Sequence, residues 1–268
     1  MSINNLLKIG IIGMGPVGSI LAVHLLEAGA FVVACDINKN RIGSIKKNGI
    51  RLKHTMEKEI PVTNTCLAVV DLQKYDLDLV VISVKAPYLK SVLAELEETL
   101  AEKTFVMSGQ NGLDNEETIA QIFGNDRTLR MVVNYAGNLD ENGGVQVTFF
   151  NPPNYITALG AKGTGIASQS TELLNTTSLE TVVLDDIRVQ TWEKAILNAA
   201  LSPVCALSRR TMRGVMETDW GVDLVKRLLI ESIAVAEAEG IDLGKEFMEH
   251  CIQYLKKGGH QAIHVDRY

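Results

Sequence analysis

The sequence has few cysteines, and their spacing excludes two common classes of site. Its 268 residues include four cysteines, Cys35, Cys66, Cys205 and Cys251, and no C-x-x-C occurs. A redox dithiol or a zinc ribbon normally places cysteines two residues apart, so neither is indicated. Isolated thiols of this kind are typical of a reducing compartment, and we therefore expect a cytoplasmic protein.

Positive charge and long apolar runs are also scarce. The net charge is −6, which argues against an electrostatic nucleic-acid partner, and no basic run indicates a membrane surface. No stretch approaches the roughly 18 uninterrupted apolar residues of a spanning helix. Gly13, Gly15 and Pro16 interrupt the apolar N-terminus, which is against a signal peptide. The remaining balance, 46% hydrophobic and 22% charged, is that of a globular protein large enough for two domains.

A glycine-rich turn near the N-terminus carries the first functional signal. An apolar run from Lys8 to Ile12 precedes Gly13-Met14-Gly15-Pro16-Val17-Gly18, and a helical run follows. In a dinucleotide-binding turn the first glycine permits the tight bend, the second lets backbone N–H groups approach a pyrophosphate, and the third lets helix and strand pack closely. Residues 13–18 are therefore predicted to bind a dinucleotide, with its phosphates at the helix N-terminus.

An acid at the end of the next apolar run narrows the choice of cofactor. Phe31 to Cys35 reads as a second buried strand, and Asp36 follows it. A carboxylate there accepts hydrogen bonds from the ribose hydroxyls of NAD and repels the 2′-phosphate of NADP. Lys39 and Arg41 follow closely and would soften this preference. We therefore expect NAD, with NADP as an alternative.

Two further polar residues follow predicted strands. Lys85 comes after the apolar run 77–84, and Asn111 comes after 104–108, inside Gly109-Gln110-Asn111-Gly112. Ligands of open α/β sheets bind beyond the carboxyl ends of the strands, so both residues are placed to meet a cofactor. The alternatives are a solvated lysine and a turn asparagine.

The order of predicted elements indicates an α/β fold with a helical C-terminal part. Strands and helices alternate up to about residue 124, and strands at 129–135, 145–150 and 155–159 follow, with a hairpin turn at 142–144. From residue 185 the pattern is helical alone, over 188–207, 219–239 and 245–257. We predict a Rossmann-type dinucleotide-binding domain over residues 1–185 and an all-α substrate or dimerisation domain over residues 186–268.

One predicted helix carries a polar stripe on an otherwise apolar sequence. In the run 195–207 the polar side chains are Asn198 and Ser202, and with Lys194 they recur every four residues. Such residues share one side of a helix. A helix that is apolar all round is buried, and buried polar groups need partners, here a substrate. The structural alternative has Ser202 bonding back to the Asn198 carbonyl, and Pro203 is expected to kink or end the helix.

Taken together, these motifs resemble the ketopantoate reductase (2-dehydropantoate 2-reductase) family. The resemblance runs from the first strand to about Ala206 and is carried by Gly13-x-Gly15-x-x-Gly18, Val84-Lys85-Ala86, Gln110-Asn111-Gly112 and Trp192-x-Lys194-x-x-x-Asn198-x-x-x-Ser202-Pro203. It implies that Lys85 and Asn111 lie on the cofactor and substrate side, that Lys194 is the catalytic proton donor, and that Asn198 helps to hold substrate and lysine.

The sequence departs from that family pattern in three places. Ser202 stands where a second asparagine is usual, and Asp36 favours NAD where many members use NADP through a nearby arginine. The C-terminal family segment is present only as residues 259–266, without its serine or its late glutamate. These departures leave open which 2-oxoacid is the substrate and whether the C-terminal segment is complete.

The function expected from these motifs is the reduction of ketopantoate or a related branched 2-oxoacid to the 2-hydroxy acid, with Lys194 as general acid and Ser202 as a substrate contact. A 3-hydroxyacid dehydrogenase also uses a lysine and an asparagine four residues apart. In that class a Gly-rich segment precedes the lysine, whereas residues 189–193 contain no glycine. A non-catalytic NAD-binding sensor would keep the glycine turn and have no need of Lys194.

Two further possibilities concern partners. His260, His264 and Asp266 have a spacing that a metal site can use, but hydride reduction needs no metal and we expect none. The long apolar helix expected over 219–239 has more apolar positions than one face holds, which is typical of a core helix. A homodimer is compatible with the sequence, which does not fix the oligomeric state.

Overall fold

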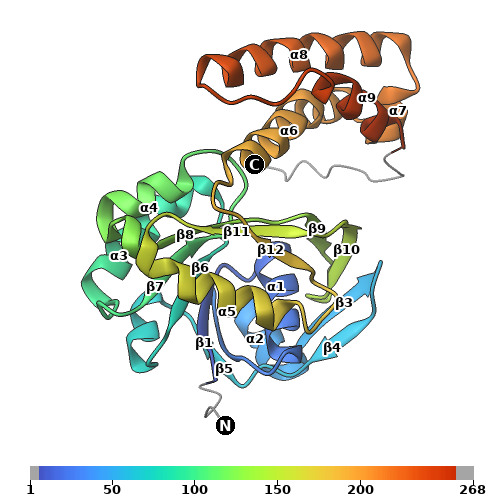
Figure 1. The fold of residues 1–268 in the computed structure, drawn as a ribbon. Coiled ribbons are helices and arrows are strands. Elements are labelled where there is room, and N and C mark those ends of the chain that lie inside the picture. Colours follow the sequence, from blue (N-terminus) through green and yellow to red (C-terminus); the bar gives the residue numbers. More distant parts are fainter. Residues whose placement is uncertain (1–5, 258–268) are drawn as a thin grey trace. The chain divides into compact units, whose positions relative to one another are not determined.

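The computed structural model describes residues 6–257. The chain divides into two compact units, residues 1–187 and residues 188–268. The first contains all the described strands, and the second is helical. Figure 1 shows the course of the chain through both units.

An eight-stranded sheet forms the centre of the first unit. Its strands run in the order β12-β11-β8-β7-β6-β1-β2-β5. Their bounds are β1 Lys8–Ile12, β2 Phe31–Cys35, β5 Asn64–Cys66, β6 Leu79–Ile82, β7 Phe105–Ser108, β8 Thr128–Val132, β11 Asn154–Ala158 and β12 Thr181–Val183. The strands from β5 through β8 pair in parallel, whereas β11 is antiparallel to β8. The chain leaves β1 towards β2 on one side and returns as β6 on the other, so the sheet has a topological switch point at β1.

Helices cover both faces of this sheet because its central strands are apolar on both sides. β6 is buried at every position, as expected of a parallel strand. One face packs against α1 (Pro16–Glu27) and α5 (Thr164–Leu174), and the other against α3 (Leu89–Thr99) and α4 (Asn115–Phe123). Short turns η1 (Val69–Lys74), η2 (Ala86–Tyr88), η3 (Asn125–Arg127) and η4 (Ala161–Gly163) complete the connections, and α2 spans Lys39–Asn48.

A second, smaller sheet packs on the outer side of α1. Its order is β4-β3-β10-β9, with bounds β3 Ile50–His54, β4 Lys58–Ile60, β9 Tyr135–Leu139 and β10 Val145–Phe150. Helix α1 contacts this sheet as well as β1 and β2, and eight of its residues are buried. One of them is His24, whose Nδ1 lies 2.8 Å from the Ile20 carbonyl and whose ring stacks on Phe150. α1 is therefore held from both sides, which fixes its N-terminus.

The second unit has its own core. It consists of α6 (Arg188–Ser208), α7 (Met212–Met216), α8 (Asp219–Ala238) and α9 (Phe247–Lys257). Ile196, Leu201, Val225, Leu229 and Leu255 are among its buried side chains. α8 is not the fully buried helix that its composition predicts, because Leu224, Ile230 and Val235 remain exposed while Val225, Leu229 and Ala236 face the core.

The predicted fold class is confirmed, since a mixed sheet rich in parallel strands is followed by helices alone. Some predicted boundaries are wrong. The run 129–135 is two strands rather than one, because Asn134 interrupts it: its backbone N–H donates to Asn154 Oδ1 at 2.7 Å. The five-residue helix α7 has no counterpart in the prediction. Cys35 and Cys66, distant in sequence, are register partners in β2 and β5, and both remain thiols.

Candidate functional site

The glycine turn between β1 and α1 has the geometry that its spacing predicts. Gly13 has φ 95°, and a Cβ there would lie 2.9 Å from the Val84 backbone nitrogen. A Cβ on Gly18 would overlap the Gly13 carbonyl oxygen. Side chains are therefore excluded at both positions by backbone strain and by close packing. The Ser83 hydroxyl donates to the Gly13 carbonyl at 2.7 Å, which ties the turn to the end of β6.

The space above the turn fits a pyrophosphate. A Cβ built on Gly15 would meet no protein atom within 4 Å, so the backbone is open to an approaching group at that residue. Gly15 is also the N-cap of α1, where no side chain caps the helix and the first turn carries no acid. The first N–H groups of a helix have no partner within the helix and attract an anion. Residues 13–18 thus fit the phosphates of a dinucleotide, although Met14 itself is fully buried and its backbone N–H and carbonyl are bonded to Asp36 and Arg41.

Asp36 lies beside this turn at the carboxyl end of β2. Its Oδ2 accepts the backbone N–H of Met14 at 2.7 Å, and its Oδ1 accepts that of Asn38 at 2.8 Å. The carboxylate is half-buried and is held by these two bonds at the mouth of the turn. A carboxylate has about four lone-pair positions, so ribose hydroxyls can still donate to it.

Arg41 does not have the role suggested by its position after Asp36. Its side chain is 7% exposed and turns inward. Nε donates to the Met14 carbonyl at 2.6 Å, Nη2 donates to Ser19 Oγ at 2.7 Å, and Nη1 donates to the Gly143 carbonyl. Arg41 is therefore a structural clamp on the glycine turn, and the expectation that it softens the preference for NAD is not supported; Lys39 remains exposed on α2.

The loops after β6 and β7 carry the next two predicted residues. Lys85 is exposed three residues beyond the end of β6, and Asn111 is exposed three residues beyond the end of β7. Because β1, β2, β6 and β7 are parallel, these residues, the glycine turn and Asp36 all lie at the carboxyl edge of one sheet. The structure thus brings the predicted residues of the first unit to a common edge, next to the switch point.

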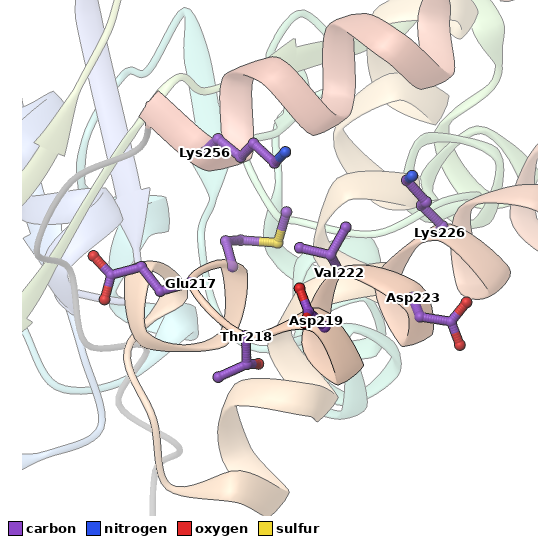
Figure 2. Close-up of a pocket in the computed structure, with 8 residues that line it drawn as sticks. Glu217, Thr218, Asp219, Val222, Asp223, Lys226 and Lys256 are labelled. Atoms are coloured by element: carbon purple, nitrogen blue, oxygen red, sulfur yellow. The ribbon is translucent and has the colours of Figure 1, made fainter.

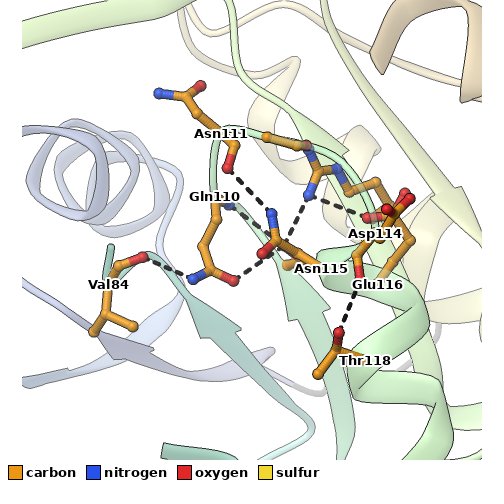
Figure 3. A network of polar contacts seen from close by, with 10 residues as sticks. Val84, Gln110, Asn111, Asp114, Asn115, Glu116 and Thr118 are labelled. Carbon is orange, nitrogen blue, oxygen red and sulfur yellow. Dashed lines mark hydrogen bonds and ion pairs between the residues drawn. The ribbon is translucent and has the colours of Figure 1, made fainter. Parts of the chain in front are cut away.

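A buried polar network lies behind the loops that carry Lys85 and Asn111 (Figure 3). The Gln110 side chain is 5% exposed, and its Nε2 donates to the Val84 carbonyl at 2.8 Å. Arg130, which is 2% exposed, donates to Ser108 Oγ at 3.0 Å and to the Gly112 carbonyl at 2.9 Å. Asn115 Nδ2 donates to the Asn111 carbonyl at 3.1 Å.

The charge of Arg130 is balanced by Glu116 on α4. The Arg130 Nη1 and Glu116 Oε2 atoms are 3.2 Å apart, and the Glu116 side chain is only 13% exposed. Burial lowers the pKa of the Arg130 guanidinium, and the nearby Glu116 and Asp114 carboxylates oppose that shift. An arginine stays protonated in proteins under these conditions, so the pair is a buried ion pair that needs both members.

The remaining predicted residues lie on α6 in the second unit. Lys194 and Ser202 are half-buried and Asn198 is exposed, whereas Ile196, Ala200, Leu201, Val204 and Cys205 face the core of that unit. The prediction of a helix buried all round is wrong, because Ala199 and Pro203 are exposed and Leu207 is 88% exposed. The stripe Lys194, Asn198 and Ser202 nevertheless follows one side of the helix, as the spacing of four predicts.

Two local alternatives for this helix can be settled within residues 6–257. Neither the Asn198 amide nor the Ser202 hydroxyl makes a hydrogen bond there, so the expected back-bond from Ser202 to the Asn198 carbonyl is not formed. α6 also continues to Ser208 with Pro203 inside it, so Pro203 does not end the helix. Since proline has no N–H, the Ala199 carbonyl lacks its usual partner within the helix.

A separate hollow of about 300 Å³ lies in the second unit, at the start of α8 (Figure 2). Lys226 and Lys256 line it together with three carboxylates, Glu217, Asp219 and Asp223. It contains none of the residues predicted from the motifs. Over the described part of the chain, no group of three or more His, Cys, Asp or Glu side chains is arranged to hold a metal ion. His260, His264 and Asp266 lie outside the described residues.

Between residues 6 and 257, no helix is both long enough and apolar enough to cross a bilayer.

The sequence assigns no role to Gln110, Arg130 or Glu116, and the role it suggests for Arg41 differs from the contacts that this side chain makes. Arg130 does leave a signal: it is a single cation in an apolar stretch, Leu-Arg-Met-Val-Val, and a buried arginine requires an acid partner. Glu116 and Glu117 at the start of α4 are the candidates that this rule indicates. The inward turn of Arg41 leaves no comparable signal in the sequence.

Family models match most of the chain. The model described as "Ketopantoate reductase PanE/ApbA" matches residues 9–163, and the model "Ketopantoate reductase PanE/ApbA C terminal" matches residues 186–264. Among curated relatives, the 2-dehydropantoate 2-reductase of Streptococcus pyogenes serotype M6 is 23% identical over 95% of this chain and 80% of its own length. That of Archaeoglobus fulgidus is 29% identical over 75% of this chain and 64% of its own length.

Solved structures show the same fold. A PanE/ApbA family ketopantoate reductase from Ralstonia eutropha JMP134 is similar with a TM-score of 0.83 and 22% identity, over 96% of this chain and 83% of that one. D-mandelate dehydrogenase, in a ternary structure with NADH and anilino(oxo)acetate, gives a TM-score of 0.81 and 23% identity, over 93% and 80%. A ketopantoate reductase from Staphylococcus aureus, described as dimeric, gives a TM-score of 0.72 and 22% identity, over 93% and 87%. The chain therefore belongs to the ketopantoate reductase family, and it is an oxidoreductase that uses a nicotinamide cofactor.

Proposed function

We propose that this protein reduces a branched 2-oxoacid, ketopantoate or a close relative, to the corresponding 2-hydroxy acid. The observation that carries the proposal is the α6 stripe: Lys194, Asn198 and Ser202 share one side of a helix, and the last two make no hydrogen bond within residues 6–257. Polar side chains at such positions are available to a substrate. Membership of the family supplies the reaction class.

The chemistry requires a hydride donor and a group that manages charge at the carbonyl oxygen. A bound nicotinamide supplies the hydride to C2 of the 2-oxoacid. Lys194 stabilises the negative charge that grows on the oxygen and gives it a proton, which combines electrostatic and general-acid catalysis.

The other predicted residues orient the reactants. Asn198 lies one turn from Lys194 and holds the lysine and the substrate in register. Asn111 of the first unit is also assigned to the substrate, and Ser202 is assigned to its carboxylate or hydroxyl. Because serine is shorter than the asparagine usual in the family, the site leaves room for a bulkier branched 2-oxoacid.

The proposed cofactor is NAD, with NADP as the alternative. Asp36 places a carboxylate beside the glycine turn, where it favours ribose hydroxyls and disfavours a 2′-phosphate. Arg41 is engaged with the turn and supplies no charge to a 2′-phosphate. The structure of D-mandelate dehydrogenase with NADH is compatible with this assignment. Lys85, Asn111 and residues 13–18 complete the proposed cofactor contacts.

We also propose separate roles for the two domains. Residues 1–185 bind the dinucleotide, and residues 186–268 bind substrate and form the dimer contact. The dimeric relative from Staphylococcus aureus supports the second assignment.

Two other functions remain as alternatives. A 3-hydroxyacid dehydrogenase shares the lysine and asparagine four residues apart, and a non-catalytic NAD-binding sensor needs only the glycine turn. A steady-state screen of branched 2-oxoacids and 3-hydroxyacids, with NADH and NADPH side by side, separates the three. The proposal is wrong if 3-hydroxyacids are the better substrates or if NADH binds without turnover of any acid.

Replacement of Lys194 tests the mechanism. Lys194→Ala removes the proton donor and the charge that stabilises the oxyanion, so kcat should fall about 10²–10⁴-fold while NADH affinity stays close to that of the wild type. Stopped-flow hydride transfer and NADH titration measure the two quantities. Lys245→Ala, which removes an exposed lysine of the same unit, is the matched control and should leave both unchanged. A wild-type rate in Lys194→Ala would contradict the mechanism.

A further inference from the structure

Two loops that carry proposed ligand contacts are joined by side chains that reach neither the glycine turn nor solvent. The Lys85 loop follows β6, and the Asn111 loop follows β7. The last backbone hydrogen bond between the two segments runs from the Gly109 N–H to the Ile82 carbonyl at 2.9 Å, so the sheet does not fix the distance between them beyond these residues. Some other interaction has to hold them.

Gln110 provides that interaction from the second loop to the first. Its Nε2 donates to the Val84 carbonyl at 2.8 Å, one residue before Lys85. Its own backbone lies one residue before Asn111. Figure 3 shows the Gln110 amide between the Val84 carbonyl and the loop from which Asn111 projects. A single buried side chain therefore connects the residues immediately preceding both proposed ligand contacts.

Arg130 fixes the Asn111 loop from beneath. Its guanidinium donates to Ser108 Oγ at the start of the loop and to the Gly112 carbonyl at its end. Ser108 Oγ in turn lies 3.4 Å from Gln110 Oε1, and Glu116 neutralises the arginine. Both ends of the 108–112 segment are thus held by one rigid, five-donor group.

We propose that Gln110 and Arg130 are positioning residues that set the separation between Lys85 and Asn111 at the carboxyl edge of the sheet. The inference rests on the proposed function insofar as Lys85 and Asn111 contact the cofactor. Neither side chain is itself a ligand, because each is at least nine-tenths buried and directed at the backbone. A ligand that contacts both loops at once depends on this separation, since a misplacement of about 1 Å is costly in a preorganised site.

The sheet contains an internal control for this inference. At the opposite end of the same two strands, the buried Thr104 hydroxyl donates to the Leu77 carbonyl at 2.9 Å. That bond also links the segment beside β7 to the segment beside β6 through a buried side chain and a backbone carbonyl. It lies at the amino edge, away from every predicted ligand contact.

The test compares Gln110→Met with Thr104→Val. Each substitution removes one buried donor to a backbone carbonyl while keeping the approximate side-chain volume. We expect both to lower the melting temperature by a similar amount, and only Gln110→Met to raise the Kd for NADH, by about tenfold. Hydrogen–deuterium exchange of the protein without cofactor should rise at residues 84–86 and 111–112 in Gln110→Met and remain unchanged there in Thr104→Val.

The NADH dissociation constants and the exchange data each test the positioning role of Gln110. Equal changes in Kd for the two variants, or unchanged exchange at residues 84–86 and 111–112 in Gln110→Met, would overturn it. Exchange is measured without cofactor or substrate, so it decides the inference even if the wild-type protein reduces no 2-oxoacid. Absence of turnover in the wild type would overturn the proposed function alone.

Gln110→Glu gives a readout that loss of packing does not reproduce. When protonated, the glutamic acid can donate its O–H to the Val84 carbonyl as the amide does; when ionised, it repels that oxygen. Burial raises the pKa of a carboxylic acid, whereas the Arg130 guanidinium, bonded to the neighbouring Ser108 and paired with Glu116, acts to lower it. NADH affinity of Gln110→Glu should therefore be near that of the wild type at low pH and fall as the pH rises, relative to wild type and Gln110→Met. A parallel pH profile in all three proteins would contradict the role of the donor.

Discussion

The two ends of the strands β6, β7 and β8 are built alike and serve different purposes. Arg127 at the amino edge donates to the Thr104 and Ala101 carbonyls and lies over the Phe123 ring. Arg130, three residues later at the opposite end, donates to Ser108 and to the Gly112 carbonyl. The first arginine is half-buried and donates to neutral carbonyls, with the Glu102 carboxylate acting on it through its charge, whereas the second is buried with a directly paired carboxylate. The interaction that is costly to bury, an ion pair, is thus found at the carboxyl edge.

A buried ion pair adds little net stability in comparison with apolar packing, because both charges lose their hydration. It does impose a defined geometry on whatever it touches. At the amino edge, where no ligand contact is predicted, neutral hydrogen bonds are sufficient to close the loops. At the carboxyl edge the costlier pair lies directly beneath the Asn111 loop. This comparison predicts that substitutions at the two edges differ in their effects on stability and on NADH affinity.

The largest difference should follow removal of the two arginines. Arg130→Met leaves the buried Glu116 carboxylate without its partner and should lower the free energy of unfolding by about 3–5 kcal/mol. Arg127→Met removes hydrogen bonds to neutral carbonyls at a half-buried site and should cost about 1–2 kcal/mol. Urea denaturation measures both.

The double variant Arg130→Met/Glu116→Gln sharpens this contrast. It removes the unpaired charge and should recover part of the stability, while NADH affinity stays reduced because the Gly112 carbonyl still lacks its donor. Full recovery of affinity along with stability would show that Arg130 acts on folding alone.

A smaller effect is expected from the two carboxylates that accept backbone N–H groups at opposite edges. Asp36 accepts from Met14 at the carboxyl edge, and Asp78 accepts from Lys8 at 2.9 Å at the amino edge. Asp36→Asn removes the charge beside the ribose and should raise the ratio of kcat/KM with NADPH to that with NADH by about tenfold, or ~1.4 kcal/mol. Asp78→Asn is the matched control and should leave the ratio unchanged. An unchanged ratio in Asp36→Asn would remove Asp36 from the ribose site.

The smallest expected effect is on the pH dependence of stability. It concerns His24, which lies in the last turns of α1, towards the amino edge. Burial lowers the pKa of His24 from its ordinary value of 6.5, with Lys58 also lowering it, while the Ile20 hydrogen bond and Glu27 oppose the shift. Below pH 6.5 the unfolded chain therefore binds more protons than the folded one, so stability falls as the pH drops towards the folded-state pKa. In His24→Gln, unfolding measured at pH 7.5, 6.5 and 5.5 should depend on pH less steeply, by at most one proton. Identical slopes would contradict this assignment.

Much of the fold follows from local patterns. Continuous apolar runs mark β1, β2 and β6, because a parallel strand is buried on both faces. The break between β8 and β9 is not local: Asn134 leaves the ladder because its N–H and side chain bond to Asn154 and Pro153, some twenty residues away. The exposure of α8 was mispredicted for a related reason, since composition gives the number of apolar residues but not the extent of the partner surface.

The site divides in the same way. Glycines 13 and 18 are predictable because backbone conformation and close approach restrict these positions to glycine. Gln110 stands inside a recognised motif, yet the sequence does not reveal that its amide turns back to Val84 rather than out to a ligand. Arg41 was misassigned because its distance along the chain from Asp36 says nothing about which way its side chain turns.

The inward position of Arg41 restricts how the cofactor preference of this protein can be changed from NAD to NADP. In dinucleotide-binding folds an arginine near the second strand can accommodate the 2′-phosphate of NADP, and for Arg41 this would require a change of rotamer. Here such a change would withdraw Arg41 from the Met14 and Gly143 carbonyls, which join the glycine turn to the hairpin of the smaller sheet. A lineage, or a designer, seeking NADP specificity would have to introduce a new cation beside residue 36 and leave Arg41 in place. A cation added in this way would leave the Arg41 contacts intact, whereas a replacement of Asp36 would also affect the turn, because Asp36 accepts the Met14 N–H.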